Sequence, residues 1–197
     1  MNTFVNEIYK ELTERIIPFW KGLRDDENGG YYGFVDYDMS VKKDAPKGGI
    51  LAARILWFFS NAYILLNDSS LLSEAEHAYL FLTEHCLDKE NGGVYWMTDY
   101  KGRPTDTMKH TYNQAFAIYA LASYYEASHS DEALKNAFRL YELIEEKCCD
   151  EYGYMEAFDR DFHVISNDAL SENGVMACKT MNTLLHVCEG YTELYRV

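Results

Sequence analysis

Basic residues are scarce in this sequence of 197 residues. It has 18 lysines and arginines against 32 aspartates and glutamates, which gives a formal net charge of −14 at pH 7. A surface of that sign repels the phosphate backbone of nucleic acids and the headgroups of anionic membranes. We therefore expect neither nucleic acid nor a membrane as a partner, and a neutral or cationic small molecule fits better.

A long uninterrupted apolar run is also missing. The most apolar segment, 50–66, is interrupted by Arg54, Ser60 and Asn61, and it falls short of the roughly 20 apolar residues that a membrane span needs. The first residues, MNTFVNEIYKEL, are acidic and amphipathic, unlike the basic start and apolar run of a signal peptide. We therefore expect a core helix at 50–66 and a cytoplasmic protein.

Motifs that hold metals or nucleotides are absent from the sequence. It has no glycine-rich phosphate loop, no GxSxG turn and no HExxH helix, so neither a metal nor a cofactor is expected. The five cysteines form no CxxC pair and no regular spacing with histidine. We expect all five to be reduced core residues, namely Cys86, Cys148, Cys149, Cys178 and Cys188.

What the sequence does contain is a repeated glycine-rich stretch. DENGGYYGF at 26–34 returns as DKENGGVYWM at 88–97 and as a degenerate copy, DEYGYMEAF, at 150–158. Copies spaced by about 60 residues indicate a repeat architecture. Glycines permit the positive φ angles of helix ends and tight turns, and we expect the following tyrosine to fold back over apolar residues. For the glycines themselves, a structural role is favoured over ligand contact.

Hydrophobic periodicity predicts six helices. They lie at 3–21, 49–67, 70–86, 110–128, 131–148 and 179–196. The first, third and fifth are half polar, whereas the second and fourth are apolar nearly all round, which is typical of an outer and an inner layer. Long loops follow each outer helix and should gather on one rim, around the N-terminal ends of the inner helices; such loops are usually functional. We predict an all-α fold of three helical hairpins in one domain, 1–197.

Polar and aromatic residues near that rim are the candidates for a site. Arg54 lies one turn into an apolar helix, and burying an unpaired guanidinium is costly, so either an ion pair or a ligand clamp would explain it. Trp57, on the same helix, is a candidate for sugar contact, because aromatic rings stack on apolar faces. Glu172, in the last long loop, would be a carboxylate on the rim or an ordinary helix cap.

The other two inner helices carry further candidates. His110, Tyr112 and Asn113 lie in the first turn of the fourth helix, and Asn182 and His186 are four residues apart on the sixth. Residues four apart share one helix face, so the last two should share a hydrogen-bonding target. A lone core histidine is more often simply satisfied by a neighbour, and that alternative stays open for His186.

Several stretches in collinear order carry a family resemblance. They are IIPFW, LRDDENGGYYG, RILWFFSNAY, GGVYWM, DTMKHTYNQAFAIYAL, EAFDR, LSENG, KTMNTLLH and EGYTELY. Together they resemble the N-terminal half of the cellobiose 2-epimerases, in the N-acylglucosamine 2-epimerase superfamily. The resemblance implies an (α/α)6 barrel, a toroid of twelve helices, of which three hairpins make about half. It also implies a cofactor-independent inversion at C2 of the reducing-end glucose of cellobiose, through a cis-enediolate.

The resemblance also implies roles for individual residues. Arg54 resembles the arginine at the enediolate oxygens, Tyr112 and Asn182 resemble groups that bind sugar hydroxyls, and His186 resembles the active-site histidine of the N-terminal half. In the family, the two proton-transfer histidines and the stacking tryptophans lie in the C-terminal half, which this chain lacks. We expect a homodimer or a complementary C-terminal half to cover the open apolar flanks.

Two other functions stay open at this point. One is a non-catalytic carbohydrate-binding or assembly module without the acid/base histidines. The other is an epimerase for mannose or N-acetylglucosamine.

Overall fold

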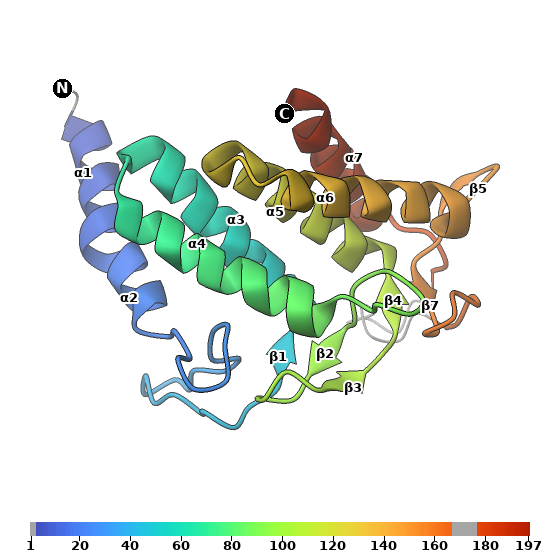
Figure 1. Ribbon diagram of the computed structural model, residues 1–197, viewed down its shortest axis with the longest axis horizontal. Coiled ribbons are helices and arrows are strands. Elements are labelled where there is room, and N and C mark those ends of the chain that lie inside the picture. The colour runs from blue at the N-terminus through green and yellow to red at the C-terminus, as the bar shows by residue number, and fades with distance from the viewer. Residues whose placement is uncertain (1–2, 167–176) are drawn as a thin grey trace.

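Three helical hairpins, each an outer helix followed by an inner one, make up the chain (Figure 1). The structure is a computed structural model that describes residues 3–166 and 177–197. The outer layer comprises α1 (Thr3–Glu11), η1 (Leu12–Ile16) and α2 (Ile17–Lys21); α4 (Ser69–Phe81) and η2 (Leu82–Cys86); and α6 (Asp131–Leu143) and η3 (Ile144–Cys148). The inner helices are α3 (Gly49–Leu66), α5 (Thr111–Ser128) and α7 (Met181–Arg196). The predicted all-α class is confirmed, and every helix end lies within two residues of its prediction.

The inner helix α5 is the centre of the fold. It packs against α3 and α7 on its two sides and against the outer helix α6. Its buried residues are mostly small, including Ala115, Ala117, Ala120 and Ala122, which lets the neighbouring helices approach closely. Helix α3 is long and apolar enough to cross a membrane by length and composition, but it packs against α4 and α5 as a core helix, as predicted.

The short connections from inner to outer helices share one chemistry. Asn67 and His129 end α3 and α5 in the left-handed conformation, with φ of 53° and 57°. The next residues cap the following helices, because the side chain of Asp68 accepts a hydrogen bond from a backbone N–H of α4 and Ser130 does the same for α6. A left-handed helix end followed at once by a polar N-cap reverses the chain within about two residues.

The long loops gather at the other end of the helices, as predicted. A three-stranded antiparallel sheet joins β1 (Lys47–Gly48), β2 (Met97–Thr98) and β3 (Pro104–Asp106); β4 (Lys109–His110) pairs with β7 (Ala157–Phe158), and β5 (Cys149–Asp150) pairs with β6 (Gly153–Tyr154). Strands β1 to β4 lie together where the inner helices begin (Figure 1). Strands β1 and β4 run directly into α3 and α5.

A buried ion pair joins each of the first two glycine turns to the inner helix that follows it. Lys47 Nζ lies 2.7 Å from a carboxylate oxygen of Asp25, and Lys109 Nζ lies 3.1 Å from one of Asp88. All four side chains are 2% exposed or less. Each lysine also donates to the carbonyl of the first glycine of its turn. Charges this deeply buried are tolerated only when they are paired and fully hydrogen-bonded.

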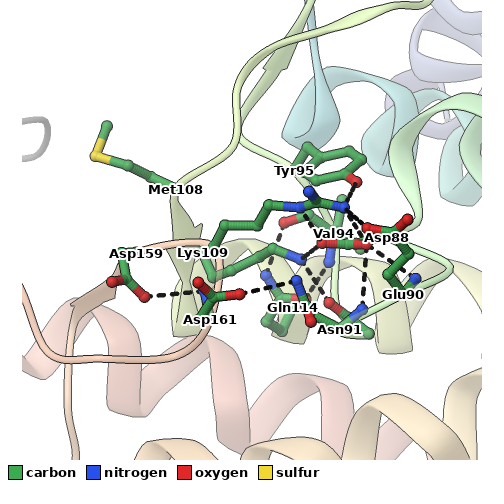
Figure 2. A network of polar contacts seen from close by, with 12 residues as sticks. Asp88, Glu90, Asn91, Val94, Tyr95, Met108, Lys109, Gln114, Asp159 and Asp161 are labelled. Carbon is green, nitrogen blue, oxygen red and sulfur yellow. Dashed lines mark hydrogen bonds and ion pairs between the residues drawn. The ribbon is translucent and has the colours of Figure 1, made fainter.

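The aspartates also hold the turns themselves together. Asp25 accepts from the backbone N–H groups of Glu27 and Asn28, at 3.1 and 3.0 Å. Asp88 repeats this two and three residues on, and Figure 2 shows it facing Lys109 beside Glu90 and Asn91. A third pair, Asp150 and Lys179, is partly exposed. All three lysines stand two residues before the first residue of an inner helix.

The glycines of the turns are required by their backbone geometry. Gly30 and Gly93 have φ of +66° and +77°, which side chains disfavour. A Cβ on Gly30 would also lie 2.6 Å from the ring of Phe81. The following tyrosine, Tyr31, is buried and stacks on Phe59. Backbone geometry therefore accounts for these glycines in the first two copies of the repeat.

The expectation for the cysteines holds only in part. All five are free thiols, and Cys86 and Cys148 are buried. Cys178 and Cys188 are exposed, so assigning them to the core was wrong. Cys188 lies on a face of α7 that no described helix covers, which its helical periodicity alone does not reveal.

Removing one lysine tests the buried pairs. We expect Lys47→Met to lower the free energy of unfolding by about 3 kcal/mol or more, because it leaves the Asp25 carboxylate buried without its counter-charge. The matched control is Lys42→Met, which removes a pair with Asp36 that is 54% and 43% exposed and should cost about 1 kcal/mol or less. Urea unfolding measures both, and equal losses would contradict the assignment.

Acid should weaken the same links. Burial alone would raise the pKa of Asp25, but the hydrogen bonds from Lys47 and from the N–H of Asn28 outweigh it and lower that pKa. A carboxyl whose pKa is lower when folded adds stability above its unfolded pKa, near 4, and loses it as the pH falls. We expect the free energy of unfolding to drop from about pH 5 towards pH 3, and Asp25→Asn to flatten the drop. An unchanged pH dependence in that variant would count against the link.

Candidate functional site

A cavity of about 220 Å³ opens between the three inner helices. Each helix contributes two side chains three residues apart, which lie on one helix face. The lining residues are Arg54 and Trp57 of α3, Phe116 and Tyr119 of α5, and His186 and Glu189 of α7. Three residues proposed from the sequence, Arg54, Trp57 and His186, therefore meet at one place.

Arg54 and the aromatic rings form one side of the cavity. The guanidinium carbon of Arg54 lies 4.8 Å from the centre of the Phe116 ring, a favourable cation–π distance. Trp57 stacks on Tyr119 with ring centres 5.4 Å apart and planes 17° apart. Arg54 is exposed on α3 rather than buried as the sequence suggested. Within residues 3–166 and 177–197 no carboxylate forms an ion pair with it, so the structural pair is absent there and the ligand clamp stays a prediction.

His186 is held from three directions. The Tyr112 ring meets it edge-on at 4.7 Å, and the Phe116 ring lies 4.5 Å away. Its Nδ1 atom lies 2.7 Å from a carboxylate oxygen of Glu189. The imidazole side chain is 15% exposed, so it is fixed yet reachable from the cavity.

Tyr119 is a neutral donor in this setting. Burial, followed by the nearby carboxylates of Glu193 and Glu189, raises its pKa, so its phenol keeps its proton at neutral pH. The cavity thus combines a permanent cation at Arg54, a carboxylate at Glu189, an imidazole and a phenol. Such a set offers hydrogen-bond donors and acceptors together with aromatic rings for contact with a polar ligand.

Asn113 and His110, selected from the sequence as binding residues, are not among the residues that line the cavity. The Asn113 amide donates 2.9 Å to the carbonyl of Tyr95. His110 is buried with its ring 4.4 Å from Trp96, and neither ring nitrogen finds a hydrogen-bond partner in the described parts of the chain. Burial lowers the pKa of His110, more than nearby carboxylates raise it. Successive helical residues point about 100° apart, so Tyr112 contacts His186 while Asn113 contacts the loop.

The two remaining candidates are less constrained. Asn182 is exposed one turn before His186 on α7, so their spacing keeps them on one face although the cavity lining does not include Asn182. Glu172 lies outside the described residues. The sequence interpretation missed Phe116, Tyr119 and Glu189. Their signal was the spacing itself: four and seven residues after Tyr112, and three residues after His186.

A larger groove of about 620 Å³ lies between α6 and α7. Its lining is apolar and aromatic, comprising Leu134, Phe138, Tyr141, Tyr191, Leu194, Tyr195 and Val197. None of these lining residues has a charged side chain, and their polar side-chain groups are the hydroxyls of three tyrosines. Because a sugar needs several fixed hydrogen-bond partners, the smaller cavity is the better candidate site despite its size.

One cluster has the ligand types that a cation prefers. Asp159, Asp161 and His163 bring one ligand atom each within 4.8 Å of one another. Their polar atoms already serve the loop, since Asp159 accepts from the backbone N–H groups of the other two and Asp161 accepts from the Asn91 amide. Figure 2 shows Asp161 and Asn91 next to the buried Lys109. We therefore assign this cluster to loop ordering.

Three hairpins with a polar, ring-lined cavity at the inner helices define about half of an (α/α)6 barrel. Residues 16–182 match the N-acylglucosamine 2-epimerase (GlcNAc 2-epimerase) family, and the chain belongs to this family. It is 60% identical over 192 residues to a cellobiose 2-epimerase of Ruminococcus albus, covering 98% of this chain and 49% of the relative. The cellobiose 2-epimerase of Eubacterium cellulosolvens is 56% identical, with 95% and 46% covered.

Solved structures agree with that assignment. The cellobiose 2-epimerase from Bacillus thermoamylovorans superposes with a TM-score of 0.97 and 56% identity, over 100% of this chain and 51% of that chain. A D-mannose isomerase, 21% identical, shares the fold with a TM-score of 0.81. The chain spans about half the length of the curated relatives it matches.

Close contact between α5 and α7 positions His186, and Gly190 allows it. A Cβ on Gly190 would lie 2.8 Å from the carbonyl oxygen of Ala115. We expect Gly190→Ala to push the helices apart and to lower the free energy of unfolding by about 1–3 kcal/mol. Cys188→Ala, at an exposed position of the same helix, is the control and should stay within about 0.5 kcal/mol. Urea unfolding compares them; a neutral Gly190→Ala would show that the contact is not tight.

Proposed function

We propose that this chain supplies one half of the sugar site of a cofactor-independent carbohydrate 2-epimerase. The substrate class is a cellobiose-type disaccharide, inverted at C2 of its reducing-end glucose. One observation carries the proposal: Arg54 and His186 line one cavity, with the Tyr112 ring packed against His186, in a chain up to 60% identical to cellobiose 2-epimerases.

Arg54 has the chemistry that a C2 inversion needs. Removing the C2 proton from the open-chain sugar leaves a cis-enediolate, whose negative oxygens must be stabilised by fixed donors. In the described parts of the chain no carboxylate forms an ion pair with the Arg54 guanidinium, so its N–H donors are available to a ligand. The Tyr112 hydroxyl and the Asn182 amide are suited to hold sugar hydroxyls, and the stacked Trp57 lines the same cavity.

His186 is the imidazole that lines the cavity. Histidine is the side chain whose ordinary pKa lies closest to neutrality, which suits general acid/base catalysis. The family resemblance assigns two further histidines to the half of the barrel that this chain does not contain. We therefore propose that proton transfer needs residues from both halves.

Open apolar surface supports the need for a second half. On α7, Met181 is 78% and Tyr195 94% exposed, and on α1, Phe4 is 65% and Ile8 53% exposed. Large exposed apolar patches are uncommon on a monomer. A complementary C-terminal half, or a second copy of the chain, would cover it.

Cytoplasmic localisation stays a prediction.

Hydrogen exchange at C2 tests the proposal. The chain is joined to the C-terminal half of the Ruminococcus albus cellobiose 2-epimerase and incubated with cellobiose in heavy water. We expect deuterium to enter at C2 of the reducing-end glucose, detected by NMR, because inversion must remove and return that hydrogen. Arg54→Met should slow the exchange about 100-fold or more, which is the usual cost of losing one oxyanion donor.

The alternatives predict other outcomes of the same experiment. A non-catalytic carbohydrate-binding module would bind cellobiose without any exchange at C2. An epimerase for mannose or N-acetylglucosamine would exchange C2 of those sugars and leave cellobiose unlabelled. Either result would overturn the cellobiose proposal.

A further inference from the structure

Glu189 is the nearest polar neighbour of the candidate histidine. The two residues stand three apart on α7, and the carboxylate oxygen lies 2.7 Å from Nδ1 of His186. An ionised carboxylate only accepts hydrogen bonds, so Nδ1 must carry the hydrogen. In the neutral imidazole the lone pair is then on Nε2, for which the described residues offer no hydrogen-bond partner.

The Glu189 side chain is 46% exposed, but its position distinguishes this contact from an ordinary surface ion pair. Glu189 lines the cavity together with Arg54, and His186 is its only hydrogen-bond or ion-pair partner in the described parts of the chain. The Tyr112 and Phe116 rings restrict the imidazole from two other directions. The Glu189 carboxylate bonds Nδ1 of His186 and no other group in the described residues, while Nε2 has no partner there. This arrangement is suited to orienting the imidazole.

We propose that Glu189 is a positioning residue for His186: it fixes the Nδ1–H tautomer and presents the Nε2 lone pair to a sugar hydroxyl in the cavity. This inference rests on the proposed function for its sugar ligand, but the tautomer itself does not. The logic is general, because the hydrogen bond at one ring nitrogen decides what the other nitrogen can do. When Nε2 takes up a proton, the Glu189 charge also stabilises the resulting imidazolium.

A simpler explanation is that Glu189 only stabilises the helix. A side-chain pair three residues apart on a helix contributes only about 0.2–0.5 kcal/mol, and such a role would leave the tautomer unaffected. His163 and Asp159 provide an internal comparison, with Nδ1 and the carboxylate 2.9 Å apart. That imidazole is 78% exposed and belongs to a loop, so it serves as a control for a pair outside the cavity.

The test reads the tautomer directly. Imidazole nitrogen-15 shifts are recorded on the chain at about pH 8, above the ordinary histidine pKa near 6.5, and His186→Gln identifies the signal. We expect His186 to be protonated at Nδ1 in the parent chain. Glu189→Gln should keep this tautomer, because its amide oxygen still accepts, whereas Glu189→Ala should lose it as the main form. Asp159→Asn, the matched control, should leave the His186 signals unmoved.

Activity supplies the second readout in the joined two-half enzyme. Glu189→Ala should lower kcat for C2 exchange roughly tenfold or more, with little change in KM, as expected when a partner that orients a histidine is lost. The kcat of Glu189→Gln should lie between that of the parent enzyme and that of Glu189→Ala. Protonation at Nε2 in the parent chain, or a tautomer unchanged in Glu189→Ala, would overturn the inference. The expected tautomers with no exchange in any joined enzyme would instead refute the proposed function and leave the positioning role standing.

Discussion

The buried lysine–aspartate pair is the interaction on which the rest of the structure depends. Asp25 with Lys47, and Asp88 with Lys109, are charges almost completely removed from water, which is tolerable only because each pair is also hydrogen-bonded to the backbone of its turn. Since each lysine stands two residues before an inner helix, the pair ties the glycine turn to the start of that helix. The start fixes the helical phase, and the phase decides which side chains face the cavity.

Helices were predictable because their signal is local, whereas these pairs were not. Three- and four-residue periodicity gave all six helices and their layers, and the glycine repeat located the rim. The partners of each buried pair are 22 and 21 residues apart, and many carboxylates and lysines in the sequence would satisfy the same pattern. The sequence has a lysine two residues before each inner helix. Only the folded chain shows that two of these lysines are buried and which aspartate each one pairs with.

The candidate site was predictable in part, for the same reason. Arg54, Trp57 and His186 could be selected because they are polar or aromatic residues on the inner helices, and all three line the cavity. Asn113 follows Tyr112 by one residue, and no sequence signal told which of the two would contact His186. Glu189 was missed because an acidic residue on a helix is ordinarily solvated. Only its contact with the histidine and its position at the cavity indicate a role.

The proposed sugar site is the cavity lined by Arg54 and His186, with Tyr112 beside the histidine. Nuclear magnetic resonance of the isotopically labelled chain, titrated with cellobiose, tests this most directly because it needs no catalysis. The account predicts that the shifts concentrate on the side chains of these three residues and on the rings beside them. Shifts confined to the apolar groove between α6 and α7, or none at saturating sugar, would contradict it.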